Sequence, residues 1–315
     1  MHSLLLAIAV LLQPVVEPEA EAAPPEVVEP PATWRFKHDD KNVKVVVLAG
    51  SVGAFWGQSY AREVERMCSN VEVKNIAKVG YGAYPLKKHF RKQVLDNRRL
   101  NLKQEGKEYW LVYGGGVNSI GTPHSNNHHV KATIVAAKHL AGMKVVELTQ
   151  SPWGDERDRR WRGIAGLGAR KRSKLVADFI MQRLTPEEAL GSYASQRPGG
   201  KTGPWDPLEV PDISIDLYDS PLRDKDATPR DLDKMRELVR KDPEWRRETK
   251  HLTEEQRAAQ LEVDAQLLAD VPRWYLRREL HSFDHIHPNE KGHAIIAATM
   301  CPSLPPSWGC TCADP

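Results

Sequence analysis

The sequence predicts an α/β fold built around a parallel β-sheet. Short apolar segments suited to buried strands recur along the chain, amphipathic segments with a helical period separate them, and glycines mark several junctions. This alternation of strand and helix is typical of parallel sheets covered by helices. The chain has 315 residues, 40% of them hydrophobic, which is enough for one large domain or two small ones.

The first half of the chain supplies three strands and three helices. Residues 43–50, 71–77 and 108–116 are apolar runs, and the first and third end in glycine. Between and after them we predict helices over residues 58–68, 85–100 and 128–142. The second of these helices shows its period through Leu86, Phe90, Val94 and Leu95. Gly142 closes the third.

The second half continues the pattern with larger interruptions. We predict strands over residues 143–149 and 213–219, and helices over 169–184 and 289–299. Residues 185–211, rich in Pro and Gly, are predicted to be a loop.

Residues 222–280 are charged, and we predict them to be a helical insertion before the last helix. Thr228 and Pro229 suit an N-cap and the first helical position, and Thr253 opens a capping box that ends at Gln256. We expect this insertion to border the site as a lid or wall; the alternative is a set of helices that only pack.

The N-terminus has the features of an export signal. Leu4 to Leu12 form an apolar run too short to span a bilayer, and residues 20–22 (Ala-Glu-Ala) offer a small-x-small cleavage site. No Lys or Arg precedes the run, so an uncleaved apolar stub is the alternative. We therefore predict a signal peptide over residues 1–22, a Pro/Glu/Ala-rich linker over 23–40 and the folded domain over 41–315. The expected location is secreted or periplasmic, without a stable membrane anchor.

The cysteines agree with export. The four of them, Cys68, Cys301, Cys310 and Cys312, allow three disulfide pairings, and three lie in the tail 301–315. No C-x-x-C pair occurs, which disfavours zinc. The formal charge is +3, and the five Glu of residues 1–33 leave the rest of the chain at +8. We see no basic block with interleaved aromatic residues, so nucleic acid is not an expected partner.

Four segments with candidate site residues follow predicted strands, at the sheet edge where parallel sheets bind ligands. Ser51 follows the first strand, Gly80 the second and Asn118 the third; Asp284 and His287 lie beyond the fifth, past the insertion. A serine hydroxyl needs a base to become a nucleophile, and His287 can supply it. Asp284, three residues earlier, can orient the imidazole. The N–H groups of Ser51 and Gly80 and the Asn118 amide are candidate oxyanion donors.

Other sites are less consistent with the chain. An α/β-hydrolase needs G-x-S-x-G, which Ala49 breaks, and neither G-x-G-x-x-G nor a P-loop is present. A metal site from His124, His128, His129 and His285 is conceivable, but the adjacent His128 and His129 point different ways on a helix. We therefore expect no metal and no cofactor.

Together these blocks resemble the SGNH hydrolases, the GDSL-like esterase and lipase family. "VVVLAGSVGAFWG" resembles the first family block, "NIAKVG" the second, "GVNS" the third, and "DHIHPNEKGH" the fifth, D-x-x-H-P-N-x-x-G, which is the most specific match. The resemblance covers roughly residues 43–150, 212–220 and 282–300. It departs at Gly50 and Ser119, where the family carries Asp.

The resemblance implies a flavodoxin-like three-layer α/β/α sandwich and ester hydrolysis, often of acetyl groups on carbohydrate. It assigns Ser51, His287 and Asp284 as nucleophile, base and acid, and places Gly80 and Asn118 in the oxyanion hole. The expected partner is an ester substrate such as an acetylated glycan. The alternative is a non-catalytic carbohydrate or cell-wall binding protein on a degenerate scaffold, with Trp56, Trp153 or Trp161 stacking on sugars.

Overall fold

A five-stranded parallel sheet forms the centre of the protein. The computed structural model describes residues 33–55, 57–114 and 117–312. The strands lie in the order β2-β1-β3-β4-β5, and every neighbouring pair is parallel. They span Val43–Ala49 (β1), Val71–Asn75 (β2), Glu108–Gly114 (β3), Lys144–Leu148 (β4) and Ile213–Ile215 (β5). This order is the flavodoxin-like one, so the predicted α/β fold is confirmed.

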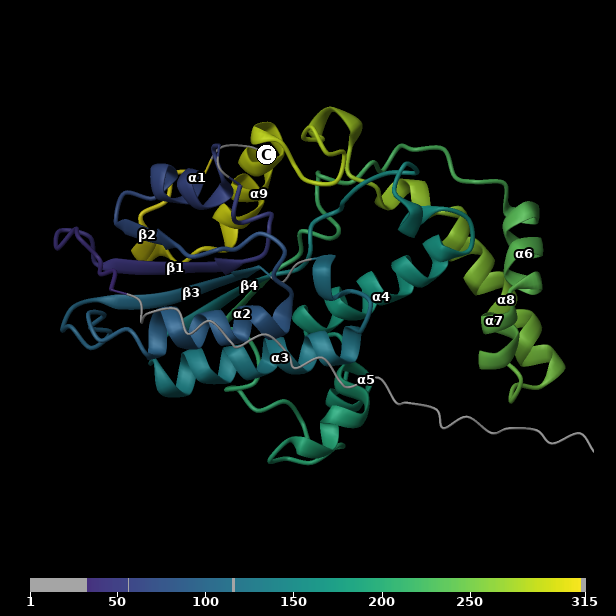
Figure 1. Ribbon diagram of the computed structural model, residues 1–315, viewed down its shortest axis with the longest axis horizontal. Helices are drawn as coiled ribbons and strands as arrows, with labels where there is room; N and C mark the ends of the chain where they lie inside the picture. Colours follow the sequence, from purple (N-terminus) through teal and green to yellow (C-terminus); the bar gives the residue numbers. More distant parts are fainter. Residues whose placement is uncertain (1–32, 56, 115–116, 313–315) are drawn as a thin grey trace, which may run out of the picture. The chain divides into compact units, whose positions relative to one another are not determined.

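Helices cover both faces of the sheet (Figure 1). On one face lie α1 (Tyr60–Met67) and α9 (Glu290–Met300), which close a core with the inward residues of the strands. On the other lie α2 (Ala83–Phe90), α3 (Pro123–Val135) and α4 (Ala165–Ile180), with a second core. All seven residues of β1 are buried. Six of these residues are apolar, as expected of a strand buried on both faces. The exception, Lys44, is paired with Glu72 at 2.7 Å.

Several predicted boundaries were wrong. The helix expected over 85–100 begins at Ala83, continues as a π-helical turn (Arg91–Leu95) and ends there. The helix expected over 128–142 begins at Pro123 and also ends in a π-helical turn (Ala136–Leu140). Its first turns were missed because their buried residues are polar: Asn127 is fully buried and donates to Ala189 O at 2.9 Å.

The predicted loop 185–211 contains a short helix, which corrects the sequence interpretation. Helix α5 (Pro186–Leu190) begins with a capping box between Thr185 and Glu188. A buried ionic network then holds the rest of the segment: Glu209 accepts hydrogen bonds from Arg197 (2.7 Å) and Lys131 (3.1 Å). The Pro and Gly residues are present, but these fixed contacts make the segment part of the fold.

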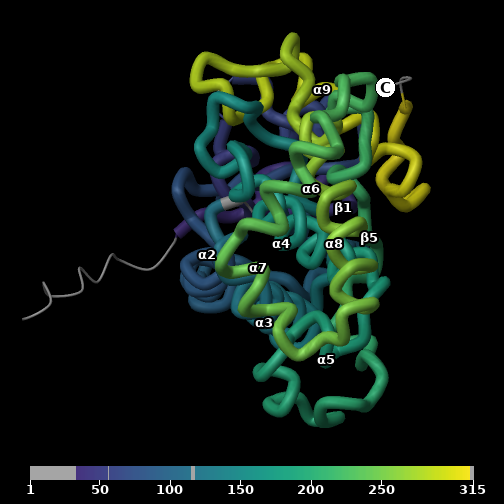
Figure 2. The backbone as a smooth tube through the Cα atoms, turned by 90° about the vertical axis from the view of Figure 1, so that its right-hand side faces the viewer, coloured from purple at the N-terminus to yellow at the C-terminus, as the bar shows by residue number. Residues whose placement is uncertain are grey.

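The insertion is helical, as predicted, and it packs on the helix layer (Figure 2). It contains α6 (Leu232–Lys241), α7 (Pro243–Glu248) and α8 (Glu254–Ala269), with α6 beside α8 and α8 against α4. The capping box at Thr253 is confirmed. The expected cap at Thr228 is wrong, because Asp231 accepts the hydrogen bond at the start of α6. A third apolar core joins these helices to the loop after β4.

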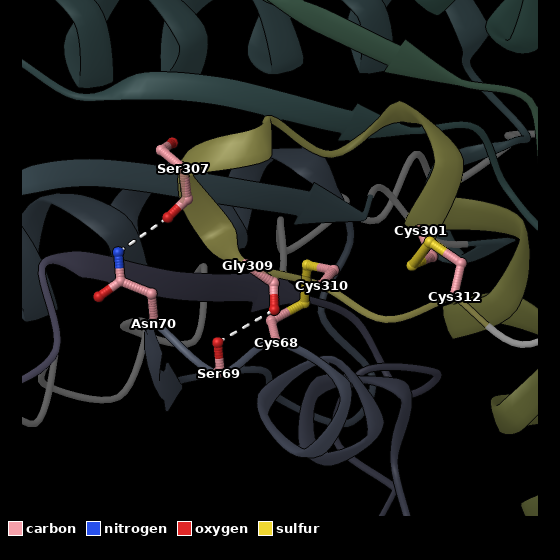
Figure 3. Close-up of a disulfide and its surroundings, with 8 residues drawn as sticks. All are labelled: Cys68, Ser69, Asn70, Cys301, Ser307, Gly309, Cys310 and Cys312. Atoms are coloured by element: carbon pink, nitrogen blue, oxygen red, sulfur yellow. Dashed lines mark hydrogen bonds between the residues drawn. A yellow bond between two sulfur atoms is a disulfide. The ribbon is translucent and has the colours of Figure 1, made fainter.

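Two disulfides fix the C-terminal tail (Figure 3). They pair Cys68 with Cys310 and Cys301 with Cys312, one of the three pairings left open. Beside the first, Asn70 Nδ2 donates to Ser307 O at 2.8 Å and Asn70 N to Trp308 O at 3.2 Å. The tail is therefore joined to the segment that leads from α1 into β2.

The predicted signal peptide (1–22) and residues 23–32 of the predicted linker lie outside the described residues. The predicted linker end at residue 40 is wrong, because Trp34 and Phe36 pack against the second core. Among the helices that are described, none combines the length and the apolar character needed to cross a membrane.

Candidate active site

Ser51 lies on the turn that follows β1. The turn is closed by a hydrogen bond from Ala54 N to Gly50 O at 3.2 Å, and the Ser51 side chain is half-buried. Its Oγ lies 2.7 Å from Nε2 of His287, a residue 236 positions later in the chain. The fold therefore brings together the two residues that the sequence suggested as nucleophile and base.

Asp284 lies on the far side of the imidazole. Its Oδ2 is hydrogen-bonded to His287 Nδ1, while its Oδ1 accepts from Ser282 Oγ at 2.8 Å, Ile286 N at 2.9 Å and His287 N at 3.0 Å. Burial raises the pKa of Asp284, but these hydrogen bonds outweigh it, so the net pKa is well below the usual range. The carboxylate is thus ionised at neutral pH. It holds the proton on Nδ1 and leaves Nε2 free to accept the Ser51 proton.

Backbone hydrogen bonds close the loop that carries Asp284 and His287. Ser282 N donates to His287 O at 2.8 Å, and Asn289 N donates to Leu280 O at 2.8 Å. His285, between the acid and the base, has a φ of +60°, an uncommon conformation for a non-glycine residue. Its ring is exposed and takes no part in the Ser51–His287–Asp284 hydrogen bonds.

A second set of contacts supports this loop from the segment after β4. Arg157 is paired with Asp155, and its Nη2 donates to His281 Nδ1 at 3.2 Å. His281 Nε2 in turn donates to Leu276 O at 2.8 Å, which fixes its tautomer. Neither Ser282 nor Arg157 was predicted from the sequence. Ser282 carries a weak signal, a hydroxyl two residues before the acid, whereas Arg157 lies 124 positions from His281 and gives none.

Gly80 and Asn118 lie on neighbouring loops at the same sheet edge. Lys78 N donates to Ala49 O at 2.9 Å, which continues the pairing of the second strand with the first and brings Gly80 toward the Ser51 turn. Asn118 Nδ2 donates to Tyr81 O at 3.4 Å, so the two loops touch. Gly80 has a φ of +78°, and a Cβ there would meet nothing within 4 Å. Glycine is therefore favoured at position 80 by backbone conformation rather than by space.

Ser119, at the position where the family that the sequence resembles carries Asp, contacts the start of α2. Its Oγ accepts a hydrogen bond from Ala83 N, the first N–H of α2, at 2.7 Å. A Cβ on Gly82 would approach that oxygen to 2.1 Å, so this contact requires glycine at 82. The hydroxyl thereby joins the loop of Asn118 to the start of α2.

The remaining histidines make local contacts. His293 is fully buried, packs against Phe55 with the rings tilted by 32° (4.6 Å between ring centroids) and accepts from Tyr60 N at 3.4 Å. His124 Nδ1 lies 3.2 Å from Ala189 O, and His128 stacks on Tyr193. Across the described part of the chain, no three His, Cys, Asp or Glu side chains are grouped to hold a metal ion.

The tryptophans considered for sugar stacking are not available for it where they are described. Trp153 is 2% exposed and Trp161 is completely buried, and the two rings pack against each other in the third core. The expectation for Trp153 is therefore wrong, because the insertion covers both rings. Trp56 lies outside the described residues.

Comparisons with known proteins return solved structures only. No family model and no curated protein matches the chain. A GDSL-like lipase from Bacteroides thetaiotaomicron is 13% identical, with 82% of this chain and 85% of that one covered and a TM-score of 0.43. A member of the lipolytic G-D-S-L family from Veillonella parvula is 14% identical (82% and 96% covered, TM-score 0.40). An acetylxylan esterase from Geobacillus stearothermophilus is 11% identical (86% and 96% covered, TM-score 0.42).

The first two structures bear the name of the family that the sequence blocks resemble. At these identities and TM-scores no activity is carried over from any of the three, and the fold assignment itself depends on the strand order. The conclusion from the site is geometric: Ser51, His287 and Asp284 form one hydrogen-bonded series, although Ser51 lies more than 230 residues before the other two. The loops of Gly80 and Asn118 follow β2 and β3, the two strands that flank β1 in the same sheet.

Proposed function

We propose that this chain is an SGNH-type serine esterase that hydrolyses carboxylic esters. The observation that carries the proposal is the series Ser51 Oγ–His287 Nε2 (2.7 Å) and His287 Nδ1–Asp284 Oδ2. A common Asp-x-x-His spacing would not by itself bring a serine 236 residues away to the free nitrogen of the imidazole. The sequence blocks that resemble the family support the same function.

The chemistry follows from the protonation states. Ser51 Oγ attacks the ester carbonyl carbon while its proton passes to His287 Nε2, and Asp284 stabilises the resulting imidazolium. The N–H groups of Ser51 and Gly80 and the Asn118 amide are the proposed donors to the oxyanion. The attack gives a tetrahedral intermediate that carries this oxyanion. Its collapse expels the alcohol, which takes the proton from His287, and leaves the acyl group on Ser51 Oγ. Water then attacks the acyl-enzyme by the same steps and releases the acid.

We further propose that the ester is an acyl group, such as acetyl, on a carbohydrate, and that the protein works in a secreted or periplasmic setting. Two disulfides that use all four cysteines support the setting, because such bonds persist in oxidising compartments. The binding-protein alternative has less support, since Trp153 and Trp161, two of the three tryptophans suggested for sugar stacking, are buried.

Hydrolysis of p-nitrophenyl esters of rising chain length, beside acetylated xylan, tests the activity. Wild type is expected to turn over the acetate, and Ser51→Ala is expected to lose turnover while keeping its circular dichroism spectrum. Among the histidines, His287→Ala is expected to be inactive and His285→Ala active, because the exposed His285 takes no part in the hydrogen bonds among Ser51, His287 and Asp284. Turnover by Ser51→Ala at the wild-type rate would refute the proposal.

A further inference from the structure

The positive charge of the protein is concentrated in one segment. Residues 74–103 contain nine Lys or Arg and a single acidic residue, Asp96, a formal charge of +8. Residues 34–315 together also carry a formal charge of +8, so those of them that lie outside 74–103 have no net charge. The expectation that the chain has no basic block with interleaved aromatic residues is therefore wrong, because Tyr81 and Tyr84 lie within this segment. Counting charge in windows along the sequence would have found it.

The basic side chains on and after helix α2 face away from the core. Leu86, Phe90 and Val94, spaced by four residues, are buried against the sheet. Basic residues at the other positions must then face away from the core. We call this surface the basic ridge and define it by Lys78, Tyr84, Lys87, Lys88, Arg91 and Arg98. Every member is exposed except Lys87, which is partly buried.

An exposed aromatic ring lies among these cations. Tyr84 is 48% exposed, and the ammonium groups of Lys87 and Lys88 lie 5.4 and 5.0 Å from its ring centroid. Lys78 lies 5.6 Å from the ring of Tyr81. The exposed part of a tyrosine side chain can contact a sugar ring, while neighbouring ammonium groups can pair with acid groups on the same sugar.

The positive potential reaches the next helix. Burial is the largest cause that lowers the pKa values of His128 and His129, to about 4 for the latter. The positive charge of Lys87 adds to the lowering of both pKa values. Both imidazoles are therefore neutral at neutral pH, and the charge of this surface comes from the lysines and arginines.

The ridge begins at the candidate active site. Asn118 Nδ2 bonds Tyr81 O (3.4 Å), and Ser119 Oγ bonds Ala83 N (2.7 Å), so the first turn of α2 is tied to the loop of the oxyanion residues. From there α2 leads away along one face of the sheet (Figure 1). A linear molecule lying on the ridge would have one end beside Asn118 and Gly80.

We propose that the basic ridge binds an anionic polysaccharide, a chain of sugars bearing carboxylates, and presents its esters to Ser51. Delivery of the ester depends on the proposed esterase function; binding itself does not. Nucleic acid fits less well, because single-strand binding uses several stacking rings. A lipid surface also fits less well, because α2 directs its apolar residues into the core and leaves no stripe to enter a membrane.

Binding is measured with the Ser51→Ala variant, because binding does not require turnover. Polygalacturonate is the anionic probe and xylan the neutral one. The ridge variant is Lys87→Glu, Arg91→Glu, Arg98→Glu. The matched control, Lys201→Glu, Arg240→Glu, Lys250→Glu, makes the same charge change at exposed positions elsewhere. The ridge variant is expected to raise the Kd for polygalacturonate about tenfold or more, and the control to leave it unchanged. Wild-type affinity should fall as NaCl rises.

Three results would overturn the inference: equal Kd values for the ridge and control variants, xylan bound as tightly as polygalacturonate, or tighter binding of single-stranded DNA or phosphatidylglycerol vesicles than of polygalacturonate.

Measurements of hydrolysis distinguish failure of the ridge proposal from failure of the esterase proposal. Binding of polygalacturonate to the ridge without turnover of p-nitrophenyl acetate by wild type would refute the esterase and leave the ridge intact. Turnover of the aryl acetate, with equal KM for acetylated polygalacturonate and acetylated xylan, would refute the ridge alone.

Discussion

The backbone N–H of Gly154 donates a hydrogen bond to the carbonyl oxygen of Ile286 at 3.3 Å. Gly154 belongs to the loop after β4, and Ile286 lies between the proposed acid and base. The Ile286 side chain packs against the third core, which the insertion helices build with Trp153 and Trp161. The insertion, expected to act as a lid or wall, thus forms part of the structure that supports the acid–base loop.

Ile286→Ala is expected to reduce kcat more than it changes KM, because the loop loses its apolar contact with the third core. We expect kcat to fall roughly tenfold, since small displacements of catalytic groups are costly. The free energy of unfolding should fall by about 1–3 kcal/mol for a half-buried isoleucine. Val263→Ala, at a 55% exposed position on α8, is the control and should change neither. Reduced stability with a normal kcat would show that Ile286 only packs.

Ser282→Ala removes one of the three hydrogen bonds to Asp284 Oδ1. The carboxylate then loses a donor that both orients it and favours its charge, so kcat is expected to fall by about tenfold, from the usual strength of a hydrogen bond to a charged group. KM should stay constant, and Ser282→Thr, which keeps the hydroxyl, should restore most of the rate. Equal kcat values for the Ala and Thr variants and wild type would exclude a positioning role.

Asn118→Ala is expected to lower kcat by roughly 10²–10³, the range for loss of one oxyanion donor. The side chain is exposed and its hydrogen bond to Tyr81 O is long at 3.4 Å, so little folding energy should be lost. Steady-state kinetics on p-nitrophenyl acetate check this. A raised KM with an unchanged kcat would instead make Asn118 a substrate-binding residue.

His293 is expected to make stability depend on pH. Burial and then the neighbouring His287 lower its pKa to about 4. The unfolded chain, with a histidine pKa near 6.5, binds more protons between these values. The stabilisation is therefore complete above pH of about 6.5 and is lost as pH falls toward 4, by at most about 3 kcal/mol.

Urea unfolding of wild type and His293→Gln between pH 4 and 7 checks this. Only the difference between the two proteins is informative, because Glu147, whose pKa burial raises, acts in the opposite direction. Wild type should lose stability relative to the variant as the pH falls. Parallel curves would contradict the assignment.

The strands were predictable because parallel strands are buried on both faces and leave apolar runs in the sequence. The ends of the helices were less predictable from the sequence. The first turns of α3 bury Asn126 and Asn127, and no apolar period marks residues that are buried through polar contacts. Helix α5 was missed because a single turn shows no period, although Thr185 and Glu188 carry its capping-box signal. The disulfide pairing depends on tertiary contacts and is not encoded in spacing.

The residues of the candidate site came from local sequence blocks, and the fold brings Ser51, His287 and Asp284 into contact. The contacts that hold these three residues in place could not be predicted from the sequence. Arg157 and Ile286 act through contacts with distant segments. The burial of Trp153 depends on insertion helices of which the first begins 79 residues later, at Leu232, so its exposure could not be judged in advance.

The central claim is that Ser51 is a nucleophile activated by His287, and covalent labelling tests it most directly. Wild type, Ser51→Ala and His287→Ala would be treated with a fluorophosphonate, and the site of modification located by peptide mass spectrometry. We predict a single adduct on the wild-type peptide that contains Ser51, none at position 51 in Ser51→Ala, and much slower labelling of His287→Ala. An adduct on another serine, or labelling of Ser51 at an equal rate without His287, would contradict the account.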